Sequence, residues 1–273
     1  MTPDSTITAD SMITAAAQRL QTVERTRVPC APIREFIGAD DIDAAYAVQQ
    51  VLVADRLAGG ARIVGRKIGL TSPAVQAQLG VDRPDFGFLF ADMDVTASGI
   101  GADALLQPKA EAEVAFVLAR DLDSAELDLD TVRDAIESSW AALEIVDSRI
   151  AGWDIRFADT VADNASSGLY VLGDRLPADV TPVDVAMTMS VNGEIVSTGS
   201  GDACLGDPLN ALLWLAETAR DHGRPLTAGQ VILSGALGPM AQIGPGDRIE
   251  ASLSVDGSPV ATVATHVEPE HTA

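Results

Sequence analysis

The sequence predicts an α+β fold in which a small helical region precedes a larger body built on a mixed or largely antiparallel β-sheet. Two observations predict it. Apolar residues recur at helical spacing up to about residue 57, and short apolar segments separated by turn signals follow from residue 113 onward. At 273 residues the chain is long enough to bury a full core. We therefore divide it into a helical N-terminal region at residues 1–65 and a sheet domain at residues 66–273.

Two helices account for the N-terminal region. Asp40 is the expected N-cap of the second helix, and Gly59-Gly60 is its expected stop. The apolar residues that define the two helices are Ile13, Ala16, Ala17 and Leu20 in the first and Ala44, Ala45, Val48, Val51 and Leu52 in the second.

A strand, a helix and a loop are expected between the helical region and the body. Residues 61–70 predict a strand interrupted by Gly65 and Gly69. Residues 71–80 predict a short helix that begins at Ser72-Pro73, because proline is favoured in a first helical turn. Residues 81–87 are expected to form a loop before the apolar segment 88–90.

The body is expected to contain many short strands and two helices. Asn192-Gly193 and Asp256-Gly257 are strong hairpin turns. The helices are expected at residues 129–138 and 208–222. The predicted strands cover residues 114–118, 142–146, 169–172, 185–191, 194–198, 231–233, 248–255 and 260–267.

The net charge of −22 argues against nucleic acid or an anionic membrane as a partner, since both require a basic surface. No apolar run approaches the roughly 20 residues of a membrane span. Cys30 and Cys204 are too few for a disulfide framework. We therefore expect a cytoplasmic protein. Because the overall field repels anions, the site for an anionic substrate would need local positive charge.

Glu111 and Glu113 are the first candidate site residues. They are two positions apart in a predicted strand, so their side chains share one face. Two carboxylates held in this way repel each other unless a cation lies between them. A third carboxylate, for which Glu144 is available, would complete a set of oxygen donors suited to Mg²⁺ or Mn²⁺. The alternative is that the pair only forms the wet face of an amphipathic strand.

The basic residues add a second indication. Only Lys67 and Lys109 among 18 basic residues are lysines, and lysine is a compact charge whose pKa can be tuned. An apolar or open surround of Ile63, Gly65 and Gly69 is expected to lower the pKa of Lys67. The chain has three histidines and no G-x-S-x-G, G-x-G-x-x-G or P-loop motif, so proton transfer must depend on carboxylates, lysine or metal-bound water.

Seven segments in order resemble the 2-keto-4-pentenoate hydratase family of the fumarylacetoacetate hydrolase superfamily. They cover residues from about 65 to 247, and the helical N-terminus fits as well. The resemblance implies a fumarylacetoacetate hydrolase-like mixed β-sheet roll. The segments are residues 65–72 (GRKIGLTS), 83–87 (RPDFG), 109–116 (KAEAEVAF), 142–147 (ALEIVD), 159–168 (DTVADNASSG), 205–208 (LGDP) and 233–240 (LSGALGPM).

The resemblance implies an activity and a set of roles. Family members bind a divalent metal through three carboxylates and add water to 2-hydroxypenta-2,4-dienoate-type acids from aromatic or steroid ring cleavage, giving 4-hydroxy-2-oxo acids. The matching positions are Glu111, Glu113 and Glu144 for the metal, Lys67 and Asp85 for catalysis, and Ser166, Asn164, Leu237 and Met240 for substrate binding. Lys109 matches no catalytic position.

Several alternatives stay open. One is the sister 2-oxo-3-hexenedioate (4-oxalocrotonate) decarboxylase, another is an acylpyruvate C–C hydrolase with a His–Glu pair, and a third is a non-catalytic partner subunit. The resemblance also implies a homo-oligomer, with a possible complex with a pathway enzyme. Asp207 stands where many relatives have histidine, and we expect it to cap the helix that begins at Pro208.

Overall fold

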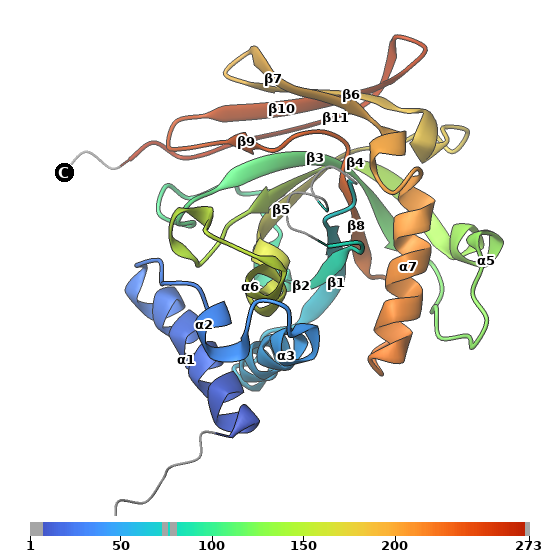
Figure 1. The fold of residues 1–273 in the computed structure, drawn as a ribbon. Helices are drawn as coiled ribbons and strands as arrows, with labels where there is room; N and C mark the ends of the chain where they lie inside the picture. Colours follow the sequence, from blue (N-terminus) through green and yellow to red (C-terminus); the bar gives the residue numbers. More distant parts are fainter. Residues whose placement is uncertain (1–7, 73–75, 77–80, 271–273) are drawn as a thin grey trace, which may run out of the picture.

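The computed structural model describes residues 8–72, 76 and 81–270. A small four-stranded sheet lies over a larger curled sheet, and helices cover the other side of the larger sheet (Figure 1). Strand β11 (Ser258–His266) of the small sheet contacts strands β4 (Ile136–Val146) and β5 (Ser167–Arg175) of the large one, so the two sheets enclose part of the core. The predicted α+β class with a mixed sheet is confirmed.

Three helices form the N-terminal region: α1 (Ala9–Thr26), α2 (Arg34–Ile37) and α3 (Ile42–Ala58). The two long helices were predicted, whereas the four-residue α2 was not. The predicted N-cap at Asp40 is wrong by one residue, because the side chain of Asp41 accepts the hydrogen bond from the amide of Ala44. The predicted stop at Gly59 is confirmed.

The large sheet has the order β2-β1-β8-β3-β4-β5, with β9 paired to β3. Strands β1 and β8 run parallel, and the other neighbours run antiparallel. The predicted domain boundary at residue 65 falls inside β1, and the division into two domains stays a prediction. The strands are β1 (Ile63–Gly69), β2 (Asp85–Phe90), β3 (Lys109–Leu118), β4 (Ile136–Val146), β5 (Ser167–Arg175), β8 (Val231–Ala236) and β9 (Ala241–Gln242).

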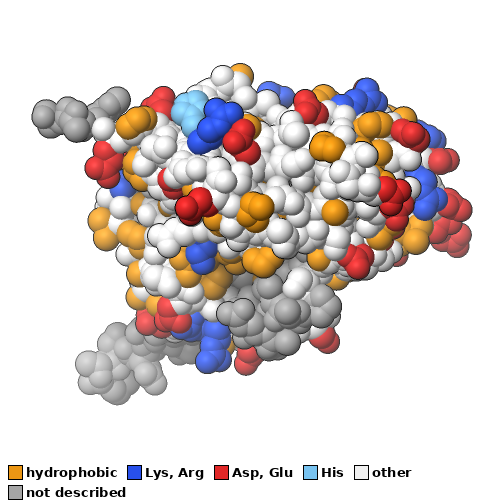
Figure 2. Space-filling model, turned by 90° about the horizontal axis from the view of Figure 1, so that it is seen from above, with side chains coloured by type: hydrophobic (Ala, Val, Ile, Leu, Met, Phe, Trp, Pro, Cys, Tyr) orange, Lys and Arg blue, Asp and Glu red, His pale blue; other side chains and the backbone are white. Residues whose placement is uncertain are grey.

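The small sheet has the order β11-β10-β6-β7, all antiparallel. Its strands are β6 (Ala186–Val191), β7 (Glu194–Ser200), β10 (Arg248–Val255) and β11 (Ser258–His266). Both predicted hairpin turns are confirmed, with Asn192 and Asp256 each followed by a glycine, all at positive φ. Figure 2 shows the outer face of this sheet, where acidic, basic and apolar side chains are scattered rather than gathered by kind.

Three further α-helices lie in the described residues 81–270, namely α5 (Leu129–Asp134), α6 (Phe157–Ala162) and α7 (Pro208–Asp221). Asp207 caps α7 through the amide of Leu209, as expected. The helix predicted at residues 129–138 is too long, because β4 begins at Ile136. Most of the helix predicted at residues 71–80 lies outside the described residues, and α6 was not predicted.

The loop predicted at residues 81–87 is wrong in its last part. Residues 85–87 belong to β2 and pair with residues 67–69 of β1. As for membranes, none of the helices in the described ranges is both long and apolar enough to cross one.

Candidate metal and active site

The antiparallel pair β3–β4 brings the three predicted metal ligands together. Glu111 and Glu113 share one face of β3, and the register places Glu144 of β4 directly opposite Glu111. One carboxylate oxygen from each residue lies within 4.8 Å of the other two. Glu113 and Glu144 are fully buried, so the alternative that the pair is only a wet strand face does not describe this structure.

The three carboxyl groups hold raised pKa values. Burial raises the pKa of Glu111 to about 7, with a further contribution from the charge of Glu144. Burial and the two neighbouring carboxylates raise the pKa of Glu113 well above its usual range. Burial also raises that of Glu144, although Lys67 opposes the effect. Without a cation, the cluster therefore retains protons near neutral pH.

The donor set fits a divalent ion. Glu113 Oε2 accepts a hydrogen bond of 2.9 Å from the amide of Gly235 at the end of β8. Within the described part of the chain, Glu113 Oε1 and Glu144 Oε2 have no hydrogen-bond partner. A buried carboxylate oxygen is costly to leave unpaired. Such oxygens pointing at one centre suit Mg²⁺, Mn²⁺ or Ca²⁺, which prefer oxygen ligands.

Lys67 lies against this cluster, as predicted. Its Nζ is 3.1 Å from Glu144 Oε1, and both side chains are buried. The expected lowering of its pKa is wrong. Burial alone does lower it, but the charges of the surrounding carboxylates, Glu144 first and then Asp85, outweigh burial and raise the pKa above its ordinary value. Lys67 is therefore protonated in the metal-free protein, and its ammonium group is ion-paired with Glu144.

Asp85 faces the same region from β2. It is buried, and burial raises the pKa of its carboxyl group although Lys67 and a hydrogen bond from Thr160 oppose the shift. A Cβ atom at Gly69 would collide with Asp85 Oδ1 and lie within 3.4 Å of Lys67 Nζ. The missing side chain of Gly69 is thus what lets carboxyl and ammonium groups approach the β1 backbone.

Ser166 reaches the group through a sharp turn after α6. Asn164, Ala165 and Ser166 form the 3₁₀ turn η3 (Asn164–Ser166), and all three have positive φ. Such a run is strained for residues other than glycine. The turn places Ser166 Oγ 3.2 Å from Thr160 Oγ1, which is 3.5 Å from Asp85 Oδ2.

The other four residues singled out in the sequence are placed differently. Asn164 directs its side chain to the backbone of Phe88, as described below. Leu237 is fully buried, whereas Met240 is 40% exposed. Lys109 lies with Nζ 4.1 Å from the ring centre of Trp153.

Sequence reasoning missed Thr160 and Gly235 as parts of the site, and it named Gly69 only as an open neighbour of Lys67. Thr160 lies in the segment 159–168 that was recognised, but nothing in its type distinguished it from a buried helix threonine. The roles of the two glycines depend on approaches from other strands, Asp85 on Gly69 and Glu113 on Gly235. No local sequence signal carries that information.

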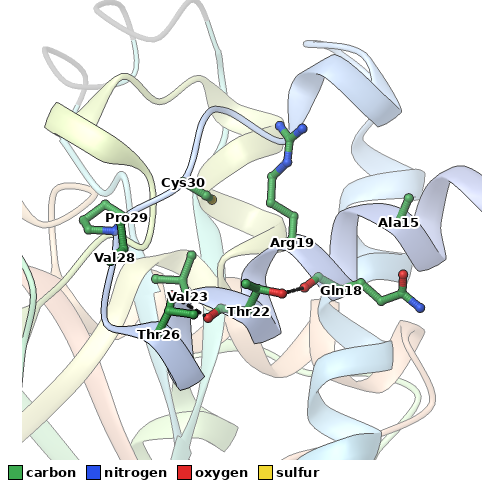
Figure 3. Close-up of a pocket in the computed structure, with 9 residues that line it drawn as sticks. All are labelled: Ala15, Gln18, Arg19, Thr22, Val23, Thr26, Val28, Pro29 and Cys30. Carbon is green, nitrogen blue, oxygen red and sulfur yellow. Dashed lines mark hydrogen bonds between the residues drawn. The ribbon is translucent and has the colours of Figure 1, made fainter.

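A separate open pocket lies at the surface beside α1. Figure 3 shows the C-terminal half of α1 on one side and the segment Val28–Cys30 on the other, and the pocket volume is about 450 Å³. None of the predicted site residues lines it. Burial raises the pKa of the Cys30 thiol to about 11, so this cysteine is a weak nucleophile.

Comparison with known proteins agrees with this arrangement. Residues 63–267 match the model of the fumarylacetoacetate (FAA) hydrolase C-terminal family. The chain is 52% identical over 252 residues to the TodF product hydratase of Pseudomonas putida, covering 91% of this chain and 94% of that protein. It is also 52% identical over 247 residues to a 2-keto-4-pentenoate hydratase of Paraburkholderia xenovorans, covering 89% and 91% of the two chains.

A solved structure extends the comparison. The 4-oxalocrotonate decarboxylase of Pseudomonas putida G7, complexed with magnesium and adipate, superimposes with a TM-score of 0.87. The two chains are 30% identical, and the match covers 96% of this chain and 99% of that one. A related structure of the same decarboxylase contains calcium and acetate.

Proposed function

This chain belongs to the 2-keto-4-pentenoate hydratase family of the fumarylacetoacetate hydrolase superfamily, and from this premise we propose a metal-dependent hydro-lyase that adds water to 2-hydroxyalka-2,4-dienoates. The products are 4-hydroxy-2-oxo acids, and the setting is aromatic or steroid ring-cleavage catabolism. The observation that supports this most is the convergence of the half-buried Glu111 with the buried Glu113 and Glu144 beside the charged Lys67.

The three glutamates would hold Mg²⁺ or Mn²⁺. A bound divalent ion supplies Lewis-acid polarisation of an α-oxygenated acid and neutralises part of its negative charge. That charge balance matters in a protein of net charge −22, whose overall field repels anions. Lys67 adds a second positive group at the same place and would bind the substrate carboxylate.

Asp85 is suited to proton transfer between substrate carbon atoms. The ketonisation of a dienol and the later addition of water each require a proton to be moved. Burial raises the pKa of the Asp85 carboxyl group, which makes it a better proton acceptor than an exposed aspartate and suits it to exchange a proton with the substrate. Ser166 contacts Thr160, which in turn contacts Asp85, and we propose that the Ser166 hydroxyl orients the substrate or the attacking water.

The distal part of the substrate is proposed to lie against Leu237 and Met240. An apolar wall leaves a charged distal group poorly solvated and accepts a short alkyl chain. This preference distinguishes a monoacid dienoate from a diacid.

Decarboxylation of 2-oxo-3-hexenedioate is the second candidate. It is favoured by the solved decarboxylase, which shares nearly the whole fold and was crystallised with magnesium and adipate. Water addition is the stronger proposal because the hydratase-named relatives are 52% identical, against 30% for the decarboxylase.

One assay separates the two reactions. Purified protein with Mg²⁺ or Mn²⁺ is given 2-hydroxypenta-2,4-dienoate and, separately, 2-oxo-3-hexenedioate, and the products are identified. We expect 4-hydroxy-2-oxopentanoate from the first and little CO₂ from the second. Rapid CO₂ release from the second with no hydrated product from the first would assign the protein as a decarboxylase.

We further propose a cytoplasmic homo-oligomer that can associate with a neighbouring enzyme of the same pathway. These proposals rest on the family resemblance. Size-exclusion chromatography with light scattering tests the oligomer directly.

A further inference from the structure

Strand β2 ends the large sheet, so one of its edges has no neighbouring strand in the sheet order. Unpaired backbone groups at such an edge need other partners. Two side-chain amides supply them. Asn164 comes from the turn η3, and Gln49 comes from α3 in the N-terminal helical region.

Asn164 pairs with Phe88 in both directions. Its Oδ1 accepts a hydrogen bond of 2.8 Å from the Phe88 amide, and its Nδ2 donates one of 2.9 Å to the Phe88 carbonyl. The carboxamide therefore satisfies both backbone groups of Phe88 at the β2 edge, as a neighbouring strand would. The backbone of this turn also lies so close to β2 that a Cβ atom at Gly87 would collide with the Asn164 carbonyl.

Gln49 of α3 links β2 to α6. Its Nε2 donates one hydrogen bond of 2.9 Å to the carbonyl of Phe86 in β2 and another of 3.1 Å to the carbonyl of Val161 in α6. The side chain is fully buried. Both hydrogen bonds are made by Nε2, whereas the buried Oε1 has no hydrogen-bond partner among the described residues.

The two segments joined by these amides carry the predicted reactive groups. Asp85 begins β2, while Thr160 belongs to α6 and Ser166 ends the turn that follows it. The contacts between them are 3.5 Å from Thr160 to Asp85 and 3.2 Å from Thr160 to Ser166. Because these contacts are long for hydroxyl groups, small shifts of either segment would break them.

We propose that Gln49 and Asn164 are positioning residues that lock β2 to the α6–η3 segment and thereby hold Asp85, Thr160 and Ser166 in register. The inference rests on the proposed function in so far as Asp85 and Ser166 act on the substrate. It replaces the expectation that Asn164 touches the substrate, since both polar groups of its side chain are already bound to Phe88. It also gives the N-terminal helical region a direct part in the site.

Asn164→Gly is the main variant. Glycine adopts positive φ without strain, so the change removes the carboxamide and keeps the turn. The chain offers a matched control in Asn192→Gly. Asn192 also has positive φ and also makes two side-chain hydrogen bonds, to Asp247 and Arg248, but in the small sheet.

We expect Asn164→Gly to lower kcat by about 10- to 100-fold with KM within about threefold of wild type, because misplacement by about 1 Å costs on the order of 100-fold. Asn192→Gly should stay within about twofold in both constants. A rise in KM at unchanged kcat would return Asn164 to the substrate-binding set. A kcat equal to that of the control would overturn the proposal.

A double-mutant cycle separates positioning from general destabilisation. If Asn164 acts through Ser166, then Asn164→Gly should lower kcat little further in a Ser166→Ala background. Additive losses would indicate a merely structural role. Gln49→Met should lower kcat in the same sense, whereas the control Gln21→Met should not, because Gln21 links α1 to α3 through Asp55.

Hydrogen exchange and a crystal structure test the positioning role of Asn164 independently of the proposed hydratase activity. In Asn164→Gly the Phe88 amide loses its acceptor, so hydrogen exchange of the peptide that contains β2 should accelerate, and a crystal structure should show longer contacts from Thr160 to Asp85 and Ser166. If wild-type protein added no water to any dienoate, the proposed function would fail while these measurements still tested the lock. Unchanged exchange and unchanged contacts would refute the lock even in an active hydratase.

Discussion

Glu111 of β3 lies directly opposite Glu144 of β4, and their carboxyl groups share one buried face with Glu113. Like charges at directly opposed positions of an antiparallel pair destabilise a sheet. Burial makes the conflict larger, because water no longer screens it. The sheet therefore carries a local defect that a divalent cation or bound protons must relieve.

Glu113→Gln should stabilise the metal-free protein and weaken its response to metal. The side-chain amide of glutamine keeps an acceptor for the Gly235 amide but removes one ionisable group, with its raised pKa, from the cluster. Since one pKa unit corresponds to about 1.4 kcal/mol, we expect the Tm in chelator to rise by at least ~2 °C at pH 8. The rise in Tm that Mg²⁺ or Mn²⁺ gives the wild type should be largely lost.

The control for this experiment is Glu137→Gln, which alters an exposed glutamate one position into the same strand β4. It should leave both Tm values within error of wild type. A Glu113→Gln protein that kept the full metal-induced rise would show that the ion binds elsewhere.

As the pH rises, the metal-free protein should lose stability, whereas the stabilisation that bound metal provides should increase. The pKa of Glu111 is about 7 in the folded state and about 4.5 when unfolded, so the folded state binds the extra proton. Its contribution to stability is therefore fully present below about pH 4.5 and is lost as the pH rises through about 7. Metal binding releases these protons, so metal affinity should increase over the same range.

Thermal unfolding between pH 5 and 8 measures both trends, once with chelator and once with excess Mg²⁺. The gap between the two Tm values should widen as the pH rises. In Glu111→Gln the contribution of this residue disappears, and the pH dependence in chelator should become shallower. A gap that narrowed toward pH 8 would contradict the assignment of these carboxyl groups as ligands.

The parts of the fold that the sequence predicted are those with a short-range cause. Asn192-Gly193 specifies its hairpin because both residues tolerate positive φ, and Asp207 caps α7 through its own neighbours. The alternation of β3 places Glu111 and Glu113 on one face by strand geometry alone. The choice of Glu144 as the third residue came from the family resemblance, and the antiparallel register confirms that it lies beside them.

The parts that were missed have long-range causes. Asp85 and Gly87 were assigned to a loop because aspartate, proline and glycine signal turns, yet pairing with β1 extends the strand over them. The pKa of Lys67 was expected to fall from its local surround, but charges on β2, β3 and β4 reverse the shift. Neither effect can be read from residues close in sequence.

Gly69→Ala should lower turnover while leaving metal binding nearly intact. The new methyl group would collide with Asp85 Oδ1 and crowd Lys67 Nζ. The three atoms nearest to it belong to Asp85 and Lys67, and none belongs to the three glutamates. We expect kcat to fall by at least about 10-fold, and the metal-induced rise in Tm to stay near wild type. Gly244→Ala is the control, since a Cβ atom there meets nothing within 4 Å.

Lys67→Arg and Lys67→Met together separate the charge of Lys67 from its shape. Arginine keeps a positive charge but carries a broad planar group, whereas methionine keeps the approximate length without charge. Lys67 is 3% exposed and lies between Glu144 and Asp85, so the guanidinium group cannot enter without displacing one of them. We expect both variants to lose at least about 100-fold in kcat.

The Tm should distinguish Lys67→Arg from Lys67→Met, although both variants are expected to lose kcat to a similar extent. Lys67→Met leaves the buried carboxylates without their counter-charge, which raises their pKa values further and should lower the Tm in chelator as the pH rises from 6 to 8. Lys67→Arg should show a smaller loss of Tm, because the charge remains. The measurement is the Tm of each variant across this pH range alongside kcat with Mn²⁺. Near-wild-type turnover in Lys67→Arg would mean that the site needs only a positive charge at this position, and that the compact ammonium group neither binds the substrate closely nor moves a proton.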